Sequence, residues 1–112
     1  MIVVANRIPV AKGFEKEFEE RFRNRAGLVE KMAGFSGFEL LRPIKGDCYL
    51  SKTSWESYDA FKAWTESAEF EEAHKRARTS LGEMFAGESK LEIHEIIQTS
   101  KKGPSEADSL LH

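Results

Sequence analysis

The sequence predicts an α+β fold with the element order βαββαβ. Some short runs alternate apolar and polar residues, which is typical of half-buried strands, while longer charged segments carry apolar residues at helical spacing. The length of 112 residues suits one domain with one modest core. This order is that of the ferredoxin-like sandwich, in which the helical segments cover one face of an antiparallel sheet.

A change of period marks the first strand and the first helix. Within residues 2–10, alternate positions form one apolar row that only Asn6 interrupts, which indicates a strand with one buried face. The following charged segment predicts an amphipathic helix over 14–32. Its apolar stripe consists of three phenylalanines spaced four apart: Phe14, Phe18 and Phe22.

The remainder of the domain predicts a hairpin, two short helices and a final strand. A short turn with a proline and a glycine joins two alternating runs, and two serines suit the N-caps of successive helices. In chain order these segments are strands over 35–42 and 47–53, helices capped by Ser57 and Ser67, a loop or frayed helix over 78–89, and a strand over 90–98. We therefore expect a single domain over 1–98 and a mobile tail over 99–112.

Composition excludes several classes of function. A formal net charge of −2 and a pI near 5.9 argue against a dedicated nucleic-acid binder. The apolar opening run is too short to span a membrane and lacks the features of a secretory signal, so no membrane partner is expected. Cys48 is the only cysteine, which excludes an intramolecular disulfide and an all-cysteine metal site and favours a reducing cytoplasm.

Three side chains that stand in apolar surfaces are candidates for a haem pocket. Asn6 lies in the strand row, Trp64 on the first short helix, and His74 on the second, where it shares a face with Phe70. An amide, a flat aromatic surface and a neutral imidazole are groups with which proteins hold an iron porphyrin and direct oxygen. Structural roles explain them too: an amide bonded to nearby backbone, a packed indole, and a core histidine bonded to a carbonyl.

Two arginines, Arg21 and Arg25, lie one turn apart beside the phenylalanine stripe. Guanidinium groups match carboxylates, so this pair suits a bound dicarboxylate, and haem carries two propionates. The alternative is a solvated boundary position in which Glu17 pairs with Arg21. The sequence contains no familiar signature of phosphate binding, dinucleotide binding, zinc proteolysis or serine hydrolysis.

Five runs of the sequence resemble successive blocks of the IsdG-type haem-degrading monooxygenases, within the antibiotic biosynthesis monooxygenase (ABM) superfamily. The resemblance covers nearly all of residues 2–98, and the runs are ANRIPV, ERFRNRAGLVE, GFSGFELLRPIKGDCY, TSWESYDAFKAWTES and FEEAHKRAR. The Asn, Trp and His of that family all have counterparts, with Asn6 in NR, Trp64 in FKAW and His74 in FEEAH.

This resemblance implies a homodimer whose sheets form a β-barrel, with one haem per subunit between the helices and the sheet. His74 would be the axial ligand of the haem iron and Asn6 would hydrogen-bond the distal oxygen ligand. Trp64 would press on the porphyrin and distort it. The other implied haem-contact residues lie on the first helix: Arg21, Phe22 and Arg25.

The reaction that the resemblance implies is oxidative opening of the haem ring by O₂ and electrons from an external donor, with haem as both cofactor and substrate and with release of iron. Two alternatives keep the fold and change the function. One is a haem-binding carrier or sensor without turnover, and the other is a cofactor-independent ABM-type oxygenase of a small aromatic. The chain departs from the family most in residues 78–89 and in the tail.

Overall fold

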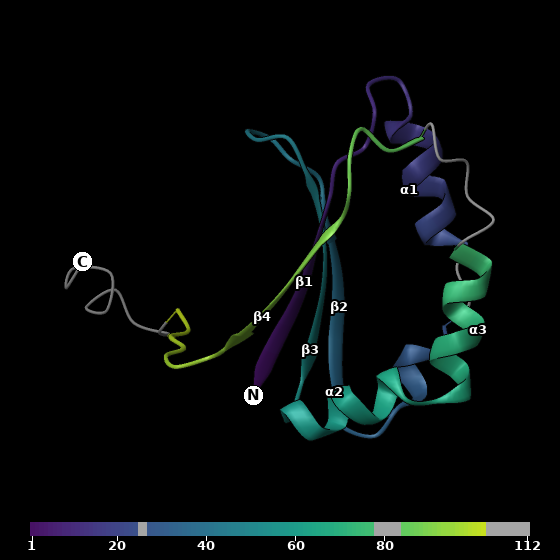
Figure 1. The fold of residues 1–112 in the computed structure, drawn as a ribbon. Coiled ribbons are helices and arrows are strands. Elements are labelled where there is room, and N and C mark those ends of the chain that lie inside the picture. Colours follow the sequence, from purple (N-terminus) through teal and green to yellow (C-terminus); the bar gives the residue numbers. More distant parts are fainter. Residues whose placement is uncertain (25–26, 78–83, 103–112) are drawn as a thin grey trace.

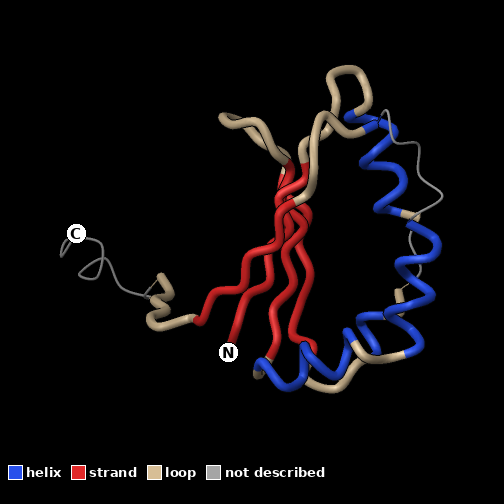
Figure 2. Tube along the Cα trace, in the orientation of Figure 1, coloured by secondary structure: helices blue, strands red, loops and turns tan. Residues whose placement is uncertain are grey.

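The computed structural model describes residues 1–24, 27–77 and 84–102, without the side chains of 73–77. A four-stranded antiparallel sheet forms one layer, and the helices form a second layer on one of its faces (Figures 1 and 2). In chain order the elements are β1 (Ile2–Ile8), α1 (Glu15–Arg23), a 3-10 turn η1 (Val29–Lys31), β2 (Phe35–Leu41), β3 (Tyr49–Trp55), α2 (Tyr58–Thr65), α3 (Ala68–Ala77) and β4 (Lys90–Glu95). The predicted order is confirmed, with α2 and α3 together forming the second helical segment.

The strand order β2-β3-β1-β4 places β1 inside the sheet between β3 and β4. Register pairs Ile2 with Trp55 and Ile8 with Tyr49 across β1 and β3. Successive residues of a strand point to opposite faces, so these four side chains share the face that the helices cover, called the inner face below. This topology confirms the predicted ferredoxin-like sandwich.

The core is divided into two clusters, one near each end of the inner face. The α2 cluster is Ile2, Val4, Val29, Trp55 and Trp64. The α1 cluster is Ile8, Phe18, Tyr49 and Met84. Because β1 contributes Ile2 and Val4 to one cluster and Ile8 to the other, the inner-facing position between the clusters is Asn6.

The first helix is shorter than the predicted segment 14–32. It ends at Arg23 with Asn24 as its C-cap, and a separate 3-10 turn begins at Val29. Asn24 and Gly27 have low helix propensity, and Val29 packs in the α2 cluster while Phe18 packs in the α1 cluster. Tertiary packing therefore divides one amphipathic pattern between two core clusters.

Other boundaries also differ from the sequence prediction. The hairpin strands end at Leu41 and resume at Tyr49, so the connection is longer than the predicted turn, and β4 ends at Glu95 rather than at residue 98. Residues 78–83 of the predicted loop and 103–112 of the predicted tail lie outside the described residues. Met84, within that predicted loop, is fully buried, and its carbonyl accepts a hydrogen bond of 2.7 Å from the Ala11 amide.

Both predicted N-caps are confirmed. The Ser57 hydroxyl accepts a hydrogen bond of 3.1 Å from the Ala60 amide, and the Ser67 hydroxyl accepts one of 3.1 Å from the Phe70 amide. These hydrogen bonds cap the first turns of α2 and α3.

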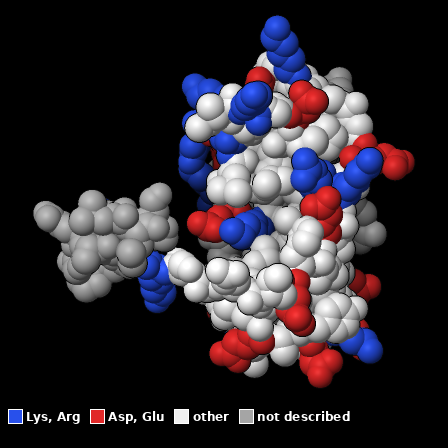
Figure 3. Space-filling model, turned by 90° about the vertical axis from the view of Figure 1, so that its left-hand side faces the viewer, with Lys and Arg blue, Asp and Glu red and all other residues white. Residues whose placement is uncertain are grey.

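The opposite face of the sheet, called the outer face, carries no helix among the described residues (Figure 1). Ion pairs of 3.7 Å between Arg7 and Glu92 and of 3.3 Å between Lys52 and Glu39 cross neighbouring strands there. Figure 3 views this side and shows uncharged surface interspersed with residues of both charges. In the described part of the chain, no helix has the length and apolar character required to cross a membrane.

Candidate functional site

Asn6 occupies the inner face between the two core clusters, as its place in the strand row predicts. Register sets it opposite Ser51 of β3 and opposite Leu91 of β4. Its side chain is half-buried and has no hydrogen-bond partner among the described residues. The alternative of a structural amide bonded to nearby backbone is therefore not observed, and the amide remains available to a ligand.

Apolar side chains beside Asn6 are left open on the same face. Leu91 is 60% exposed and Ile93 is 40% exposed, although β4 pairs with the inside strand β1 and both residues face the helices. A helix packed against this part of the sheet would cover them. Open apolar surface next to the half-buried amide of Asn6 suits an apolar ligand that carries a polar group.

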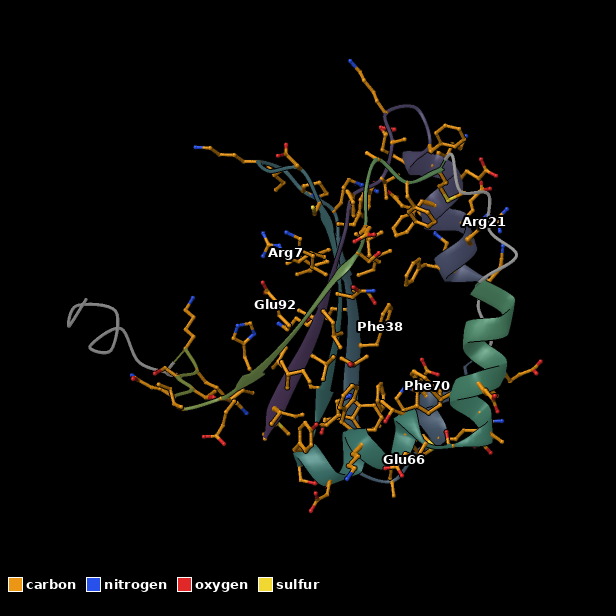
Figure 4. All side chains as sticks on the ribbon, in the orientation of Figure 1. Arg7, Arg21, Phe38, Glu66, Phe70 and Glu92 are labelled. Carbon is orange, nitrogen blue, oxygen red and sulfur yellow. The ribbon has the colours of Figure 1, made fainter. Side chains whose placement is uncertain are left out.

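Trp64 is buried in the α2 cluster, where the sequence allowed either core packing or a ligand contact. It is 6% exposed, and its ring makes an edge-to-face contact with Phe70 of α3 at a centroid distance of 5.5 Å. Figure 4 shows that Phe70 projects from α3 on the side of the sheet. Trp64 thus joins α2 to α3, and it belongs to the same core cluster as Ile2 and Val4, which lie on the inner face of β1 with Asn6.

The phenylalanine stripe of α1 faces the sheet. Phe22 lies parallel to Phe38 of β2, with an interplanar angle of 5° and a centroid distance of 6.1 Å. Arg21 lies beside it on α1 and forms the predicted ion pair with Glu17, at 3.7 Å. This pair is the solvated arrangement that sequence analysis weighed against a carboxylate clamp, although Arg21 has a further interaction beyond the pair.

A carboxylate joins α1 to the hairpin. Glu19 accepts hydrogen bonds from Nε of Arg42 at 2.7 Å and from the Tyr49 hydroxyl at 2.5 Å, and Arg42 also donates to its second oxygen. The bonds from Arg42 and then Tyr49 lower the pKa of Glu19 to about 2. Burial, followed by the bond to Glu19, raises the pKa of Tyr49, so its hydroxyl stays protonated as a donor. This network fixes the distance between α1 and β3.

A pocket of about 400 Å³ lies between α1 and the hairpin strands. Its lining combines the two parallel phenylalanines with the Glu19 network: Glu19, Phe22, Arg23, Phe38, Leu40, Arg42 and Tyr49. Leu40 in the pocket wall is opposite Ser51 of β3, and Ser51 is opposite Asn6 of β1. The pocket therefore adjoins the part of the inner face that contains Asn6. Aromatic walls, arginines and the amide of Asn6 therefore lie along one side of the sheet.

Two of the predicted site residues are placed only in part. His74 lies in α3, one turn after Phe70, and its side chain is outside the description, while Arg25 lies outside the described residues altogether. Ser51, which was not among the predicted site residues, is the cross-strand neighbour of Asn6. The two-residue alternation of side chains in β3 could have indicated its position. Ser51 lies two residues after Tyr49 and two before Thr53, so all three side chains point to the same face of the sheet.

The sequence matches the family model described as antibiotic biosynthesis monooxygenase over residues 1–76. A heme oxygenase (mycobilin-producing) of Mycobacterium tuberculosis strain H37Rv is 50% identical over 64 residues, which cover 56% of this chain and 61% of that protein. The chain thus matches somewhat less than two thirds of that relative's length. A heme oxygenase (staphylobilin-producing) of Staphylococcus haemolyticus is 40% identical over 85 residues, which cover 71% of this chain and 80% of that protein.

The fold also matches a solved structure along nearly its whole length. The structure is that of the heme-degrader MhuD from Mycobacterium tuberculosis with two hemes bound in its active site. The match has a TM-score of 0.73 and 35% sequence identity, and it covers 90% of this chain and 100% of that one. Sequence and fold therefore lead to the same group of proteins.

Proposed function

The chain belongs to the antibiotic biosynthesis monooxygenase family, and from this premise we propose that it is a haem-degrading monooxygenase. It binds haem between the sheet and the helices and opens the porphyrin ring with O₂ and electrons from an external donor, releasing iron. The named activities of the relatives support this proposal. The structural observation that carries it is Asn6, a half-buried amide without a partner in the described part of the chain, in the middle of the inner face.

The residues present fit a large, flat and mainly apolar group with carboxylate ends. Phe22 and Phe38 offer aromatic surface, Leu91 and Ile93 offer open apolar surface, and Asn6 offers an amide between them. When bound, haem would supply an iron centre for the reduction of O₂ and would itself be the group that is oxidised. The protein supplies position, polarity and exclusion of water.

Each site residue then has a distinct proposed role. His74 on α3 supplies the imidazole that binds the iron, and Asn6 supplies a hydrogen bond on the side of the sheet. Trp64 contacts the porphyrin and bends it, and the support for this role is that its ring is held from two sides, by Phe70 and by the α2 cluster. A rigid wall can impose a shape on a bound ring only when the wall itself does not yield.

The first helix provides the proposed contacts with the haem edge. Phe22 faces the sheet, and we propose that Arg21 meets a haem propionate near the exposed side of α1. Arg25, which lies outside the described residues, is proposed as a second propionate contact. Arg21 would exchange part of its 3.7 Å pairing with Glu17 for a carboxylate of the ligand. Such an exchange has a small free-energy cost because ion pairs between exposed side chains contribute little to stability.

We also propose that two copies associate through their outer faces to form a β-barrel. The outer face lacks a covering helix among the described residues and carries apolar side chains between cross-strand ion pairs. Figure 4 shows Arg7 and Glu92 projecting to that side, away from the helices. A small domain gains apolar burial when a second copy covers such a face.

Domain limits and location belong to the same proposal. Residues 1–98 form the functional domain, and 99–112 form a tail that the haem site does not require. A reducing, cytoplasmic location is supported by the free thiol of Cys48.

Haemin titration of the purified protein, followed by absorption spectroscopy, tests the function. We expect a saturable Soret band that His74→Ala abolishes, and that fades when ascorbate is added with catalase present. The matched control is His94→Ala, which removes an exposed imidazole from the outer face of β4; its oligomeric state is checked in parallel. A band that persists under reduction would indicate a carrier, and absence of a specific band would refute haem binding.

A further inference from the structure

Ser51 is a second polar side chain at the centre of the inner face. It is directly opposite Asn6 on β3, and on its other side it is opposite Leu40 of β2. Its side chain is half-buried and makes no hydrogen bond within the described residues. Directly opposite residues of an antiparallel pair have Cβ atoms about 4.5–5.5 Å apart. The Ser51 hydroxyl and the Asn6 amide therefore form one polar patch.

Comparison with Thr53 on the same face shows that Ser51 has no structural task among the described residues. Thr53, two residues further along β3, accepts a hydrogen bond of 3.0 Å from Nε1 of the fully buried Trp55. Thr53 thereby satisfies a core indole, whereas Ser51 satisfies no group of the described structure. A half-buried hydroxyl beside a half-buried amide, neither with a partner in the described part of the chain, lowers stability unless a ligand or water hydrogen-bonds to them.

The position of the patch explains what it can reach. It lies between the α1 and α2 clusters, next to the open apolar side chain of Leu91 and next to the pocket wall at Leu40. A ligand that covers the apolar surface from Leu40 to Leu91 must therefore lie over both Ser51 and Asn6. Two adjacent donors can hydrogen-bond one small anion or polar atom more tightly than either alone.

We propose that Ser51 is a ligand-contacting residue of the haem site and acts beside Asn6 as a second hydrogen-bond donor. It binds the small anionic or polar molecule that occupies the space between the haem and the sheet. This inference rests on the proposed haem binding and adds a residue to it. The hydroxyl of Ser51 also accepts hydrogen bonds, so it can hold a water against the Asn6 amide when no such molecule is present.

Azide affinity of the ferric haem complex, measured by spectral titration, tests the inference separately from turnover. Loss of one hydrogen bond to an anion weakens binding by about 3- to 10-fold, which we expect for Ser51→Ala. Ser51→Thr keeps the hydroxyl and should stay near the wild-type value. The matched control is Ser54→Ala, the same change on the same strand, at a residue that register places on the outer face opposite Val3. Because that face is the proposed dimer interface, the oligomeric state of this variant is checked in parallel.

The outcomes separate the two proposals. If Ser51→Ala binds haem and azide as the wild type does, the inference is overturned while the proposed function stands. If Ser51→Thr loses as much azide affinity as Ser51→Ala, the hydroxyl is not responsible and the inference also fails. If the wild-type protein gives no specific haem complex, the proposed function fails first and the role of Ser51 falls with it.

Discussion

Replacing Asn6 with leucine should make the ligand-free protein more stable while weakening its site. Leucine has nearly the shape of asparagine but no amide to desolvate. In the structure this amide is half-buried, faces the two core clusters and has no partner among the described residues. Removing it should therefore relieve a cost that the folded protein carries for its ligand.

The size of the effect follows from burial. A fully buried polar group without a hydrogen bond costs about 1–3 kcal/mol. Since Asn6 is only half-buried, about half of that cost applies, and we expect Asn6→Leu to raise the free energy of unfolding by about 0.5–1.5 kcal/mol. For a domain of this size, the midpoint of thermal unfolding should rise by several degrees.

Urea denaturation of the ligand-free protein at one fixed subunit concentration measures this change. Thr53→Val is the matched control, because it is also a polar-to-apolar change of nearly equal shape on the inner face. There the hydroxyl accepts the bond from Trp55, so we expect a loss of about 1 kcal/mol or more. If Asn6→Leu destabilises the protein as Thr53→Val does, the amide has a structural partner and the reasoning about the site is wrong.

Three further predictions concern the elements that hold the site. Trp64→Ala should lower the free energy of unfolding by about 3–5 kcal/mol, because it leaves a cavity between α2 and α3. Urea denaturation measures the loss, and a change under about 1 kcal/mol would contradict the observed packing of Trp64. Gly34→Ala should destabilise the fold by about 2 kcal/mol or more, since Gly34 has φ +84° and a new Cβ would lie 2.5 Å from Cβ of Ala60. The control is Gly46→Ala, whose new Cβ would meet no atom within 4 Å. Equal losses of stability in the two variants would show that the contact with Ala60 is unimportant. Glu19→Gln should make stability depend less on pH in the acid range. The pKa of Glu19 is lowered to about 2 in the folded state, below the unfolded value near 4.3. The stability that the ionised carboxylate contributes is therefore present above about pH 4.3 and is lost as the pH falls toward 2. Denaturant midpoints between pH 2 and pH 7 measure this dependence, and identical slopes for variant and wild type would refute it.

The sequence alone predicted most of the architecture because periodicity records burial. Alternation in the strands and the three- to four-residue spacing in the helices gave the correct order of elements, and the serine caps marked the starts of α2 and α3. Asn6 was recognisable as a candidate because it is the one polar residue in an apolar row of β1. The burial of that row in the structure then showed that it lies on the inner face of the sheet. Family resemblance added the expected roles of the residues.

Features that depend on contacts between distant segments were decided only by the tertiary structure. The pattern over 14–32 looked like one helix, but packing of Phe18 in the α1 cluster and of Val29 in the α2 cluster divided it. Met84 carried no periodic signal, and the structure buries it in the α1 cluster with Ile8 and Phe18. Periodicity reports which face of an element is buried, and it does not report what that face is buried against.

The same distinction applies to the site. The sequence by itself predicted three candidate site groups: the amide of Asn6, the indole of Trp64 and the imidazole of His74. Only the strand register showed that Ser51 stands beside Asn6, because residues far apart in the chain become neighbours through pairing of β1 with β3. A site assembled across strands is a property of register, and register is fixed by the packing of the whole sheet.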